Sequence, residues 1–181
     1  MVMTAPRHLY LVALGSNLGD RARLLDGAAA EIAARLGEVV ARSPAYETEP
    51  MGAADQPFLN AALVLRSPEA PEAVLAALLA IEAQLGRVRR ERWGNRTIDL
   101  DLLLWRPDGQ EGGTWESATL RLPHPEMLKR DFVLVPACDV AADWLHPGTH
   151  RTLAAETAAR GYGLKPASAS PPAPRSSRRE P

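Results

Sequence analysis

Cysteine, aromatic residues and long apolar runs are all scarce in this sequence. Its 181 residues include a single cysteine, Cys138, and only 5% aromatic residues. One cysteine excludes an intrachain disulfide, which fits a reducing compartment. Because Cys138 lies in the apolar stretch 132–138, it is interpreted as a small buried hydrophobic residue rather than as a nucleophile.

Signals for secretion and for membrane insertion are also missing. Residues 1–8 contain no apolar core of signal-peptide length. No apolar stretch reaches the roughly 20 residues that a membrane-spanning helix needs. The formal net charge of −1 creates no overall field that would attract nucleic acid or an anionic membrane. The sequence therefore predicts a cytoplasmic protein with no membrane partner and no nucleic-acid partner, in which any basic function is local.

Length and composition predict one folded domain. Hydrophobic residues make up 46% and charged residues 24% of the chain, which are ordinary values for a globular protein. The chain is long enough to bury a core without disulfides or a structural metal. From residue 166 onward proline, serine, alanine and arginine dominate. Such a segment has nothing to bury, so residues 166–181 are predicted to form a disordered tail after a domain of residues 1–165.

The apolar pattern predicts alternating strands and helices. Asp20 and Pro71 are typical of helix starts, and Gly37 and Gly86 are typical of helix ends. The expected strands are residues 8–14, 38–46, 58–66 and 97–105, and the expected helices are residues 21–36 and 71–85. A hairpin is expected at 111–122, short helices around 125–129 and 132–141, and a last helix at 151–160. The order β-α-β-β-α-β is that of the ferredoxin-like fold, an α+β architecture.

Two aspartates stand out in the strand expected at 97–105. Side chains at positions i and i+2 of a strand share a face, so Asp99 and Asp101 lie together, about 7 Å apart at the backbone. The other face is expected to hold the core residues Ile98, Leu100, Leu102 and Leu104. The aspartates are either two solvated acids on an open sheet face or ligands of a hard cation such as Mg²⁺, which prefers carboxylate oxygens.

The loop before this strand is rich in arginine. It contains Arg87, Arg89, Arg90, Arg92 and Arg96. Guanidinium groups bind phosphate through two parallel hydrogen bonds, so arginines beside a metal-binding pair favour a polyphosphate substrate. A run of this kind on its own is usually a solvated loop. Trp93, in the same loop, is either an anchoring residue of a lid or part of the core.

Two further features have both a structural and a functional interpretation. His124 lies between two prolines and is either a surface histidine or a contact to a nucleotide. The turn Gly15–Asp20 resembles a phosphate-binding loop only weakly, because it lacks the lysine and the glycine spacing of the known phosphate loops. A structural turn is the favoured interpretation.

Taken together, the motifs resemble one family, the 6-hydroxymethyl-7,8-dihydropterin pyrophosphokinases of folate biosynthesis. The resemblance runs from about residue 9 to residue 136, and the block 92–101, Arg-Trp-Gly-Asn-Arg-Thr-Ile-Asp-Leu-Asp, is its most specific part. The other matching segments are residues 13–19, 43–48, 56–61, 81–82, 85–87 and 123–125, with Arg130 and Phe132.

The resemblance implies a fold and a reaction. The fold is a modified ferredoxin-like three-layer α/β/α sandwich with an antiparallel central sheet. The reaction is transfer of pyrophosphate from ATP to the hydroxymethyl group of 6-hydroxymethyl-7,8-dihydropterin, with release of AMP. The cofactor would be two Mg²⁺ ions, with ATP as the cosubstrate, and we expect the chain to act as a monomer.

The resemblance also implies roles for individual residues. Asp99 and Asp101 would bind the two Mg²⁺ ions. The residues with catalytic roles would be Arg87, Arg96, Asp99 and Asp101. The residues of the pterin site would be Thr48, Phe58, Asn60, Trp93 and Phe132, with the aromatic rings on the flat faces of the pterin and Asn60 at its polar edge. The residues of the ATP site would be Glu82, Arg89, His124 and Arg130.

Two other functions remain as alternatives. A nucleotidyltransferase also uses Gly-Ser and Asp-x-Asp motifs, but there they lie about a dozen residues apart, whereas here most of two βα units separate them. A ferredoxin-like module that binds nucleic acid without catalysis would need exposed aromatic residues on its central strands. Leucines, Leu11 and Leu63, occupy the middle of those strands instead. The sequence therefore favours the enzyme.

Overall fold

The chain folds around one antiparallel sheet. A computed structural model describes residues 7–50, 52–86 and 97–167. The sheet has the order β2-β4-β1-β5, and β3 pairs with β4 beyond this path. Its strands are β1 (His8–Ser16), β2 (Glu38–Arg42), β3 (Tyr46–Thr48), β4 (Phe58–Ser67) and β5 (Asp99–Pro107). This order and the all-antiparallel pairing confirm the predicted ferredoxin-like α+β fold.

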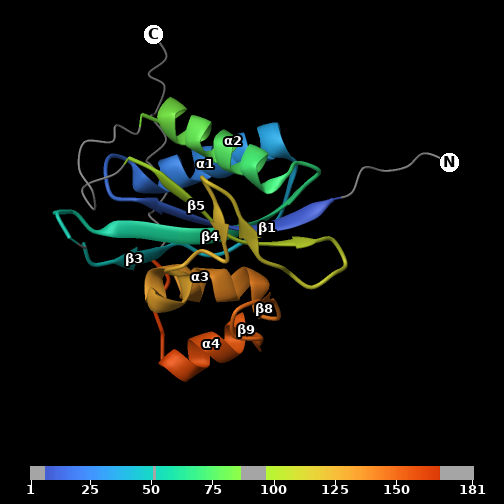
Figure 1. The fold of residues 1–181 in the computed structure, drawn as a ribbon. Helices are drawn as coiled ribbons and strands as arrows, with labels where there is room; N and C mark the ends of the chain where they lie inside the picture. The colour runs from blue at the N-terminus through green and yellow to red at the C-terminus, as the bar shows by residue number, and fades with distance from the viewer. Residues whose placement is uncertain (1–6, 51, 87–96, 168–181) are drawn as a thin grey trace, which may run out of the picture.

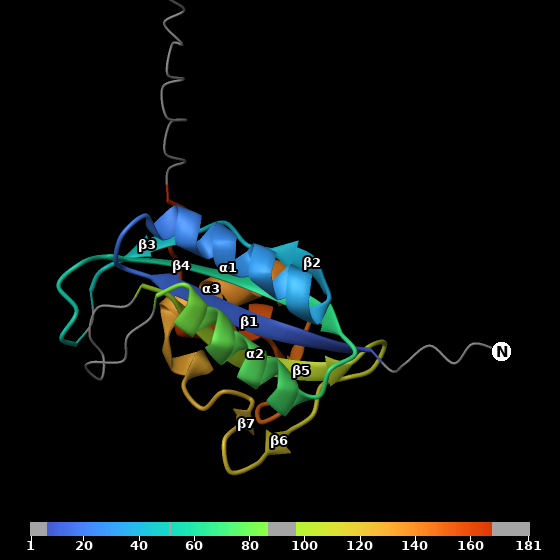
Figure 2. The same ribbon diagram turned by 90° about the horizontal axis from the view of Figure 1, so that it is seen from above.

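Helices cover both faces of the sheet and make the layers of a sandwich. The helices α1 (Arg21–Leu36) and α2 (Pro71–Gln84) lie on one face, and α3 (Asp131–Ala141) lies on the other (Figure 1). Figure 2, seen from above, shows α1 and α2 side by side across the strands. The helix α4 (Leu153–Arg160) packs on the outside of α3. The predicted α/β/α arrangement is therefore confirmed.

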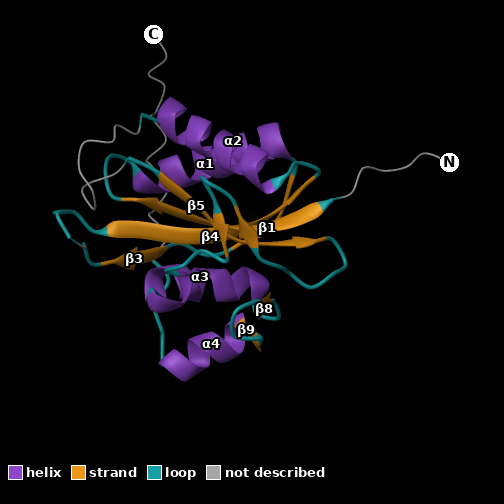
Figure 3. Cartoon of the chain, in the orientation of Figure 1, coloured by secondary structure: helices purple, strands orange, loops and turns teal. Residues whose placement is uncertain are grey.

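Short elements complete the chain after β5. One two-stranded pair is β6 (Trp115–Glu116) with β7 (Arg121–Leu122), labelled in Figure 2, and another is β8 (Leu145–His146) with β9 (Arg151–Thr152), labelled in Figure 3. Between them in the chain lies the 3₁₀ turn η1 (Met127–Lys129). The hairpin and the two short helices that the sequence predicts here are confirmed. The last predicted helix begins two residues late, because Arg151 and Thr152 form β9 before α4 starts.

Local chemistry explains where α1 begins and ends. The Asp20 side chain accepts a hydrogen bond from the backbone N–H of Arg23 at 3.1 Å, which caps the first turn. At the other end Gly37 has φ 143°, a conformation that favours glycine. A Cβ atom at position 37 would lie 2.3 Å from the carbonyl oxygen of Arg66. Only glycine therefore allows the chain to pass directly from α1 into β2.

The continuous apolar run of β1 supplies both cores. Tyr10, Val12 and Leu14 face α1 and α2, whereas Leu9, Leu11 and Ala13 face α3. A strand that is buried on both faces needs apolar residues at successive positions, as the sequence predicts for this segment. No helix among the described residues is long and apolar enough to span a bilayer.

The strand predicted at 38–46 is divided in the structure into β2 and β3. The strand expected at 38–46 is interrupted after Arg42, because Ser43 bonds to Ala62 with both its backbone N–H and its side chain. The Ser43 backbone N–H donates to the Ala62 carbonyl at 2.9 Å, and its Oγ accepts from the Ala62 N–H at 2.9 Å. The chain resumes pairing with β4 at Tyr46, as β3.

A bulge in β5 overturns one part of the predicted core. Val12 pairs with Leu102 and Leu11 pairs with Leu104, so Leu103 has no partner on β1. The extra residue shifts the alternation of side chains by one position. Ile98, Leu100 and Leu102 lie under α1 and α2 as expected, but Leu104 faces α3. Its assignment to the same face as Leu100 was wrong.

The domain extends slightly beyond its predicted end. Pro166 forms a β-bridge with Tyr46, and the Ala167 N–H donates to the Ala45 carbonyl at 2.8 Å. Residues 166 and 167 therefore belong to the folded domain and not to the tail. The rest of the predicted tail, residues 168–181, lies outside the described residues. Cys138 is half-buried rather than fully buried.

Candidate active site

Asp99 and Asp101 lie at the start of β5 with their side chains on one face of the sheet. Asp99 pairs with Gly15 of β1, and Asp101 pairs with Ala13. Directly paired residues of an antiparallel sheet share a face, and Ala13 packs against α3. Both carboxylates are therefore on the α3 side of the sheet, where they are half-buried. The predicted pairing of the two acids on one face is confirmed.

The neighbouring strand places an amide in the same row. Gly15 pairs on its other side with Asn60 of β4, and Ala13 pairs with Ala62. One row across the sheet thus reads Asn60, Gly15, Asp99. Neighbouring strands are about 4.8 Å apart, so the backbones of Asn60 and Asp99 are separated by roughly 10 Å. The positions between the amide and the two carboxylates carry no side chain larger than a methyl group.

Asn60 is held in place by Thr48. Its Nδ2 donates to the Thr48 Oγ1 at 2.7 Å, and the residue is only 7% exposed. Phe58 lies two residues before Asn60 on β4, on the same face, and pairs with Thr48. The structure thus brings together three of the residues predicted for the pterin site, Thr48, Phe58 and Asn60.

A hydrogen bond joins this group to α3. The Tyr46 hydroxyl donates to the Asp139 Oδ2 at 2.5 Å. Burial, and then the hydrogen bond to Asp139, raises the pKa of Tyr46 to about 12, so the hydroxyl keeps its proton at neutral pH. Phe132 lies two turns before Asp139 on α3, on the same side of the helix. The bond therefore fixes the strand that carries Thr48 relative to the helix that carries Phe132.

His124 has a defined tautomer. Its backbone N–H donates to the Leu103 carbonyl at 2.8 Å, and its Nδ1 accepts from the Glu126 N–H at 3.2 Å. The ring proton is therefore on Nε2. Burial, followed by the positive charge of Arg130, lowers the pKa of His124, and the charges of Glu126 and Asp99 partly oppose this. His124 is a neutral donor within the electrostatic reach of both Arg130 and Asp99.

Arg130 is next to Phe132 at the start of α3. Its guanidinium carbon lies 6.0 Å from the centroid of the Phe132 ring, which is at the limit of a cation–π contact. Arg130 thus lies beside the predicted aromatic residue of the pterin site, and His124 lies within electrostatic reach of both Arg130 and Asp99.

Comparison with known proteins identifies the family. The sequence profile of the 7,8-dihydro-6-hydroxymethylpterin-pyrophosphokinase (HPPK) family matches residues 11–142. The chain belongs to the HPPK family. It is 47% identical over 132 residues to the 2-amino-4-hydroxy-6-hydroxymethyldihydropteridine pyrophosphokinase of Methylorubrum extorquens, a match that covers 72% of this chain and 80% of that protein. The enzyme of the same name from Pseudomonas aeruginosa is 45% identical over 143 residues, covering 77% of this chain and 85% of that protein.

Solved structures agree with the HPPK fold. A crystal structure of Plasmodium falciparum HPPK-DHPS superposes with a TM-score of 0.67 over 88% of this chain, at 14% identity. This chain spans 45% of the length of that chain. The similarity at this identity concerns the fold alone. It supports the antiparallel sheet with helices on both faces.

Four residues that the HPPK resemblance singles out lie outside the described residues: Arg87, Arg89, Trp93 and Arg96. Among the predicted site residues that the structure describes, Glu82, on α2, is the one that does not lie on the α3 side of the sheet. The rest come from β3, β4, β5 and the segment 124–132, which includes the start of α3.

Glu82 is buried on the opposite side of β5. Its side chain is 3% exposed, and its Oε1 accepts a hydrogen bond from the backbone N–H of Leu100 at 2.7 Å. Leu100 lies between Asp99 and Asp101 on the edge strand of the sheet. The carboxylate thus satisfies a backbone donor at the edge of the sheet and fixes the segment that carries both acids. This hydrogen bond indicates a positioning role for Glu82, and the ATP contact that the resemblance implies stays a prediction.

Replacing Glu82 tests this role. Glu82→Ala leaves the Leu100 N–H without this acceptor, so we expect a loss of about 1–3 kcal/mol of unfolding free energy together with reduced turnover. Glu82→Gln keeps a side-chain oxygen at the same position and should retain most of both. Urea unfolding and steady-state kinetics measure the two effects. Equal losses in the glutamine and alanine variants would contradict the assignment.

The lowered pKa of His124 gives a second prediction. Because its pKa is lowered in the folded protein, His124 should titrate below pH 6.5 and contribute stability that is lost as the pH falls toward its folded pKa. A non-hydrolysable ATP analogue adds negative charge beside the ring and should raise its pKa. NMR titration of the imidazole signals, assigned with His124→Gln, measures the shift. An unchanged midpoint with saturating nucleotide would exclude His124 from the phosphate site.

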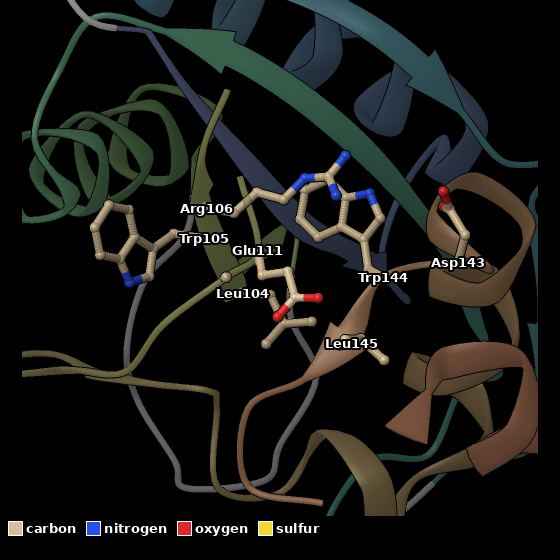
Figure 4. Close-up of a pocket in the computed structure, with 8 residues that line it drawn as sticks. Leu104, Trp105, Arg106, Glu111, Asp143, Trp144 and Leu145 are labelled. Atoms are coloured by element: carbon tan, nitrogen blue, oxygen red, sulfur yellow. The ribbon is translucent and has the colours of Figure 1, made fainter. Parts of the chain in front are cut away.

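A separate pocket lies at the far end of β5. It encloses about 200 Å³ and is lined by Arg106, Glu111 and Trp144, among others (Figure 4). The Arg106 guanidinium stacks over the Trp144 ring at 4.4 Å. Arg106 is five residues beyond Asp101, roughly 16 Å along the strand. None of the predicted site residues lines this pocket, so we do not place the substrates there.

Three features of the site were not predicted from the sequence. They are the open positions that Gly15 and Ala13 leave between Asn60 and the two acids, and the Tyr46–Asp139 hydrogen bond, which joins residues 93 positions apart. A signal existed for Glu82, which lies four residues after Leu78 and therefore continues the buried side of α2. An acid at a buried helical position needs a partner.

Proposed function

We propose that the face of the sheet between Asn60 and Asp99 is where this chain carries out the reaction of its family. That reaction is transfer of pyrophosphate from ATP to 6-hydroxymethyl-7,8-dihydropterin in folate biosynthesis, with release of AMP. The observation that carries the proposal is the row Asn60, Gly15, Asp99. It places the Asn60 amide, which suits a heterocycle, and the Asp99 carboxylate, which suits a metal–phosphate group, on one face of the sheet. Gly15, which has no side chain, lies between them.

The pterin end of the site rests on Asn60 and Thr48. The Asn60 amide has both a donor and an acceptor for the polar edge of a pterin, and its hydrogen bond to Thr48 fixes its orientation. We assign Phe58 and Phe132 to the two flat faces of the ring, since aromatic pairs favour stacked arrangements with a planar ligand. Phe58 comes from the sheet and Phe132 from α3, so the two rings approach from different layers.

The phosphate end of the site suits Mg²⁺. No cluster of three or more potential metal ligands occurs among the residues that the structure describes, so those residues do not form a complete cage. Two carboxylates with phosphate oxygens and water are the ligand set that Mg²⁺ commonly adopts, and Asp99 and Asp101 fit it. We propose that they bind two Mg²⁺ ions together with ATP. Mg²⁺ held there would neutralise charge on the phosphates and make the attacked phosphorus more electrophilic.

Neighbouring side chains would hold the nucleotide. The neutral His124 can donate from Nε2 to a phosphate oxygen, and the Arg130 guanidinium can pair with phosphate. Glu82 keeps the Asp99–Asp101 segment in place through Leu100. Arg87, Arg89, Trp93 and Arg96 remain predictions from the family resemblance. In that assignment Arg87 and Arg96 stabilise charge during transfer, Arg89 contacts ATP and Trp93 seals the pterin site.

The nucleic-acid-binding alternative conflicts with the fold. A ferredoxin-like module that stacks bases presents an open sheet face. Here Leu11 is 0% exposed beneath α3, and Leu63 is 0% exposed beneath α1 and α2. Both faces of the sheet are covered at the middle of the central strands. We propose that the chain acts as a monomer.

Product analysis tests the proposed reaction. The protein is mixed with MgATP and 6-hydroxymethyl-7,8-dihydropterin, and the nucleotide products are separated by chromatography. We expect AMP and the pterin diphosphate in equal amounts, with no AMP when the pterin is omitted. Formation of ADP, or of AMP at the same rate without pterin, would contradict pyrophosphate transfer.

A further inference from the structure

The backbone conformation at position 15 does not require the glycine, Gly15, that occupies it. It lies in β1, paired with β4 on one side and β5 on the other. Six glycines among the described residues have positive φ, and Gly15 is not one of them. An extended backbone of this kind accepts any residue, and glycine within a strand is otherwise unfavourable. The reason for glycine at this position lies in the space above it.

That space is occupied by the amide of Asn60. A Cβ atom at position 15 would lie 3.0 Å from the Asn60 Oδ1 and 4.0 Å from the Phe58 Cδ1. The second distance is an ordinary contact, whereas the first is tighter than nine in ten real Cβ contacts. Even an alanine at this position would therefore press on the amide oxygen.

The amide is restrained from the opposite side as well. Its Nδ2 donates to the Thr48 Oγ1 at 2.7 Å. With both restraints present, the Asn60 side chain must shift by a few tenths of an ångström to accommodate a methyl group at position 15, and such a shift strains its hydrogen bond to Thr48. Absence of a side chain at position 15 is thus what lets the amide keep its orientation.

We propose that Gly15 is a positioning residue for the pterin, acting through Asn60. Its missing side chain leaves the Asn60 oxygen directed over β1 toward the carboxylates, in the orientation that meets the polar edge of the substrate. This inference rests on the proposed function, because it takes Asn60 to be a pterin contact. It predicts that a methyl group at position 15 weakens pterin binding and leaves the nucleotide site intact.

The direct test compares two glycine variants. Gly15→Ala should weaken binding of 6-hydroxymethyl-7,8-dihydropterin at least about tenfold, the loss that one ordinary hydrogen bond accounts for. Affinity for a non-hydrolysable MgATP analogue should change less than about twofold, both being measured by calorimetry. Gly27→Ala is the matched control, because its Cβ would lie 4.0 Å from the Leu85 Cδ2, an ordinary contact. It should leave both affinities unchanged.

A double-mutant cycle tests whether the effect passes through Asn60. In the Asn60→Ala background the amide is gone, so adding Gly15→Ala should cost no further pterin affinity. The proposal is overturned if Gly15→Ala leaves pterin affinity unchanged, or if its cost is the same with and without Asn60.

Thermal unfolding gives a readout that does not depend on the substrate. Gly15→Ala should lower Tm, and Asn60→Ala added to it should restore part of the loss by removing the clash. Should Gly15→Ala fail to fold, the double variant should still fold, and failure of both would overturn the proposal. If the wild-type protein makes no AMP from MgATP and pterin, the proposed function fails while the stability result still reports on the clash.

Discussion

Replacing Asp99 or Asp101 with alanine should lower turnover by on the order of a thousandfold or more and leave the fold intact. The two carboxylates are the only groups we assign to the metal ions, and loss of preorganised charge stabilisation at a reacting phosphate typically costs 10²–10³ in rate or more. Both acids are half-buried and contribute to neither apolar core. Rates of AMP formation measure the first effect, and circular dichroism with urea unfolding measures the second.

Asp108 provides the matched control for these variants. It follows β5 on the same segment and accepts a hydrogen bond from the Arg66 Nε at 3.0 Å, at the far end of the strand. Exposed ion pairs contribute about 0–1 kcal/mol, so Asp108→Ala should keep near-normal turnover and lose little stability. Near-normal turnover of Asp99→Ala or Asp101→Ala would remove the metal assignment.

Asn60→Ala should reduce kcat/KM for the pterin by about a hundredfold, the cost of two lost hydrogen bonds. The KM for ATP should stay close to the wild-type value, because Asn60 lies one strand away from Gly15 and two from Asp99. Steady-state kinetics with each substrate varied in turn measures both constants. A fall in kcat/KM for the pterin without a change in the KM for ATP assigns Asn60 to the pterin end of the site.

Thr48→Val is the comparison for Asn60. It keeps the shape of the side chain but removes the acceptor of the Asn60 Nδ2 hydrogen bond. We expect a smaller loss in kcat/KM for the pterin, about tenfold, since the amide itself remains. An equal loss of efficiency toward ATP and pterin in Asn60→Ala would indicate general damage to the site and would contradict the assignment of Asn60.

The sequence predicted the acidic pair because strand alternation is a local property. Asp99 and Asp101 needed only the two-residue period of a strand to be placed on one face. The same rule failed at Leu104, because the bulge at Leu103 depends on how β5 pairs with β1. A bulge is set by the partner strand, which one segment of sequence does not reveal.

The wider site depends on contacts between distant segments. Asn60 and Asp99 face each other across Gly15 only because β1 pairs with both β4 and β5 in one register. No periodicity in the sequence fixes that register. The buried state of Glu82 likewise depends on β5 being an edge strand whose Leu100 N–H needs an acceptor. The family resemblance supplied the names of these residues, and the structure supplied the physical reason for their positions.

Counting metal ions tests the central claim most directly. Mn²⁺, which takes the same oxygen ligands as Mg²⁺, is titrated into the protein with a non-hydrolysable ATP analogue, and the free ion is measured by electron paramagnetic resonance. The account predicts two bound ions per chain in the wild-type protein. In the double variant Asp99→Asn, Asp101→Asn it predicts at most the one ion that the nucleotide carries. The same number of ions in both proteins would contradict the assignment of Asp99 and Asp101 as the metal site.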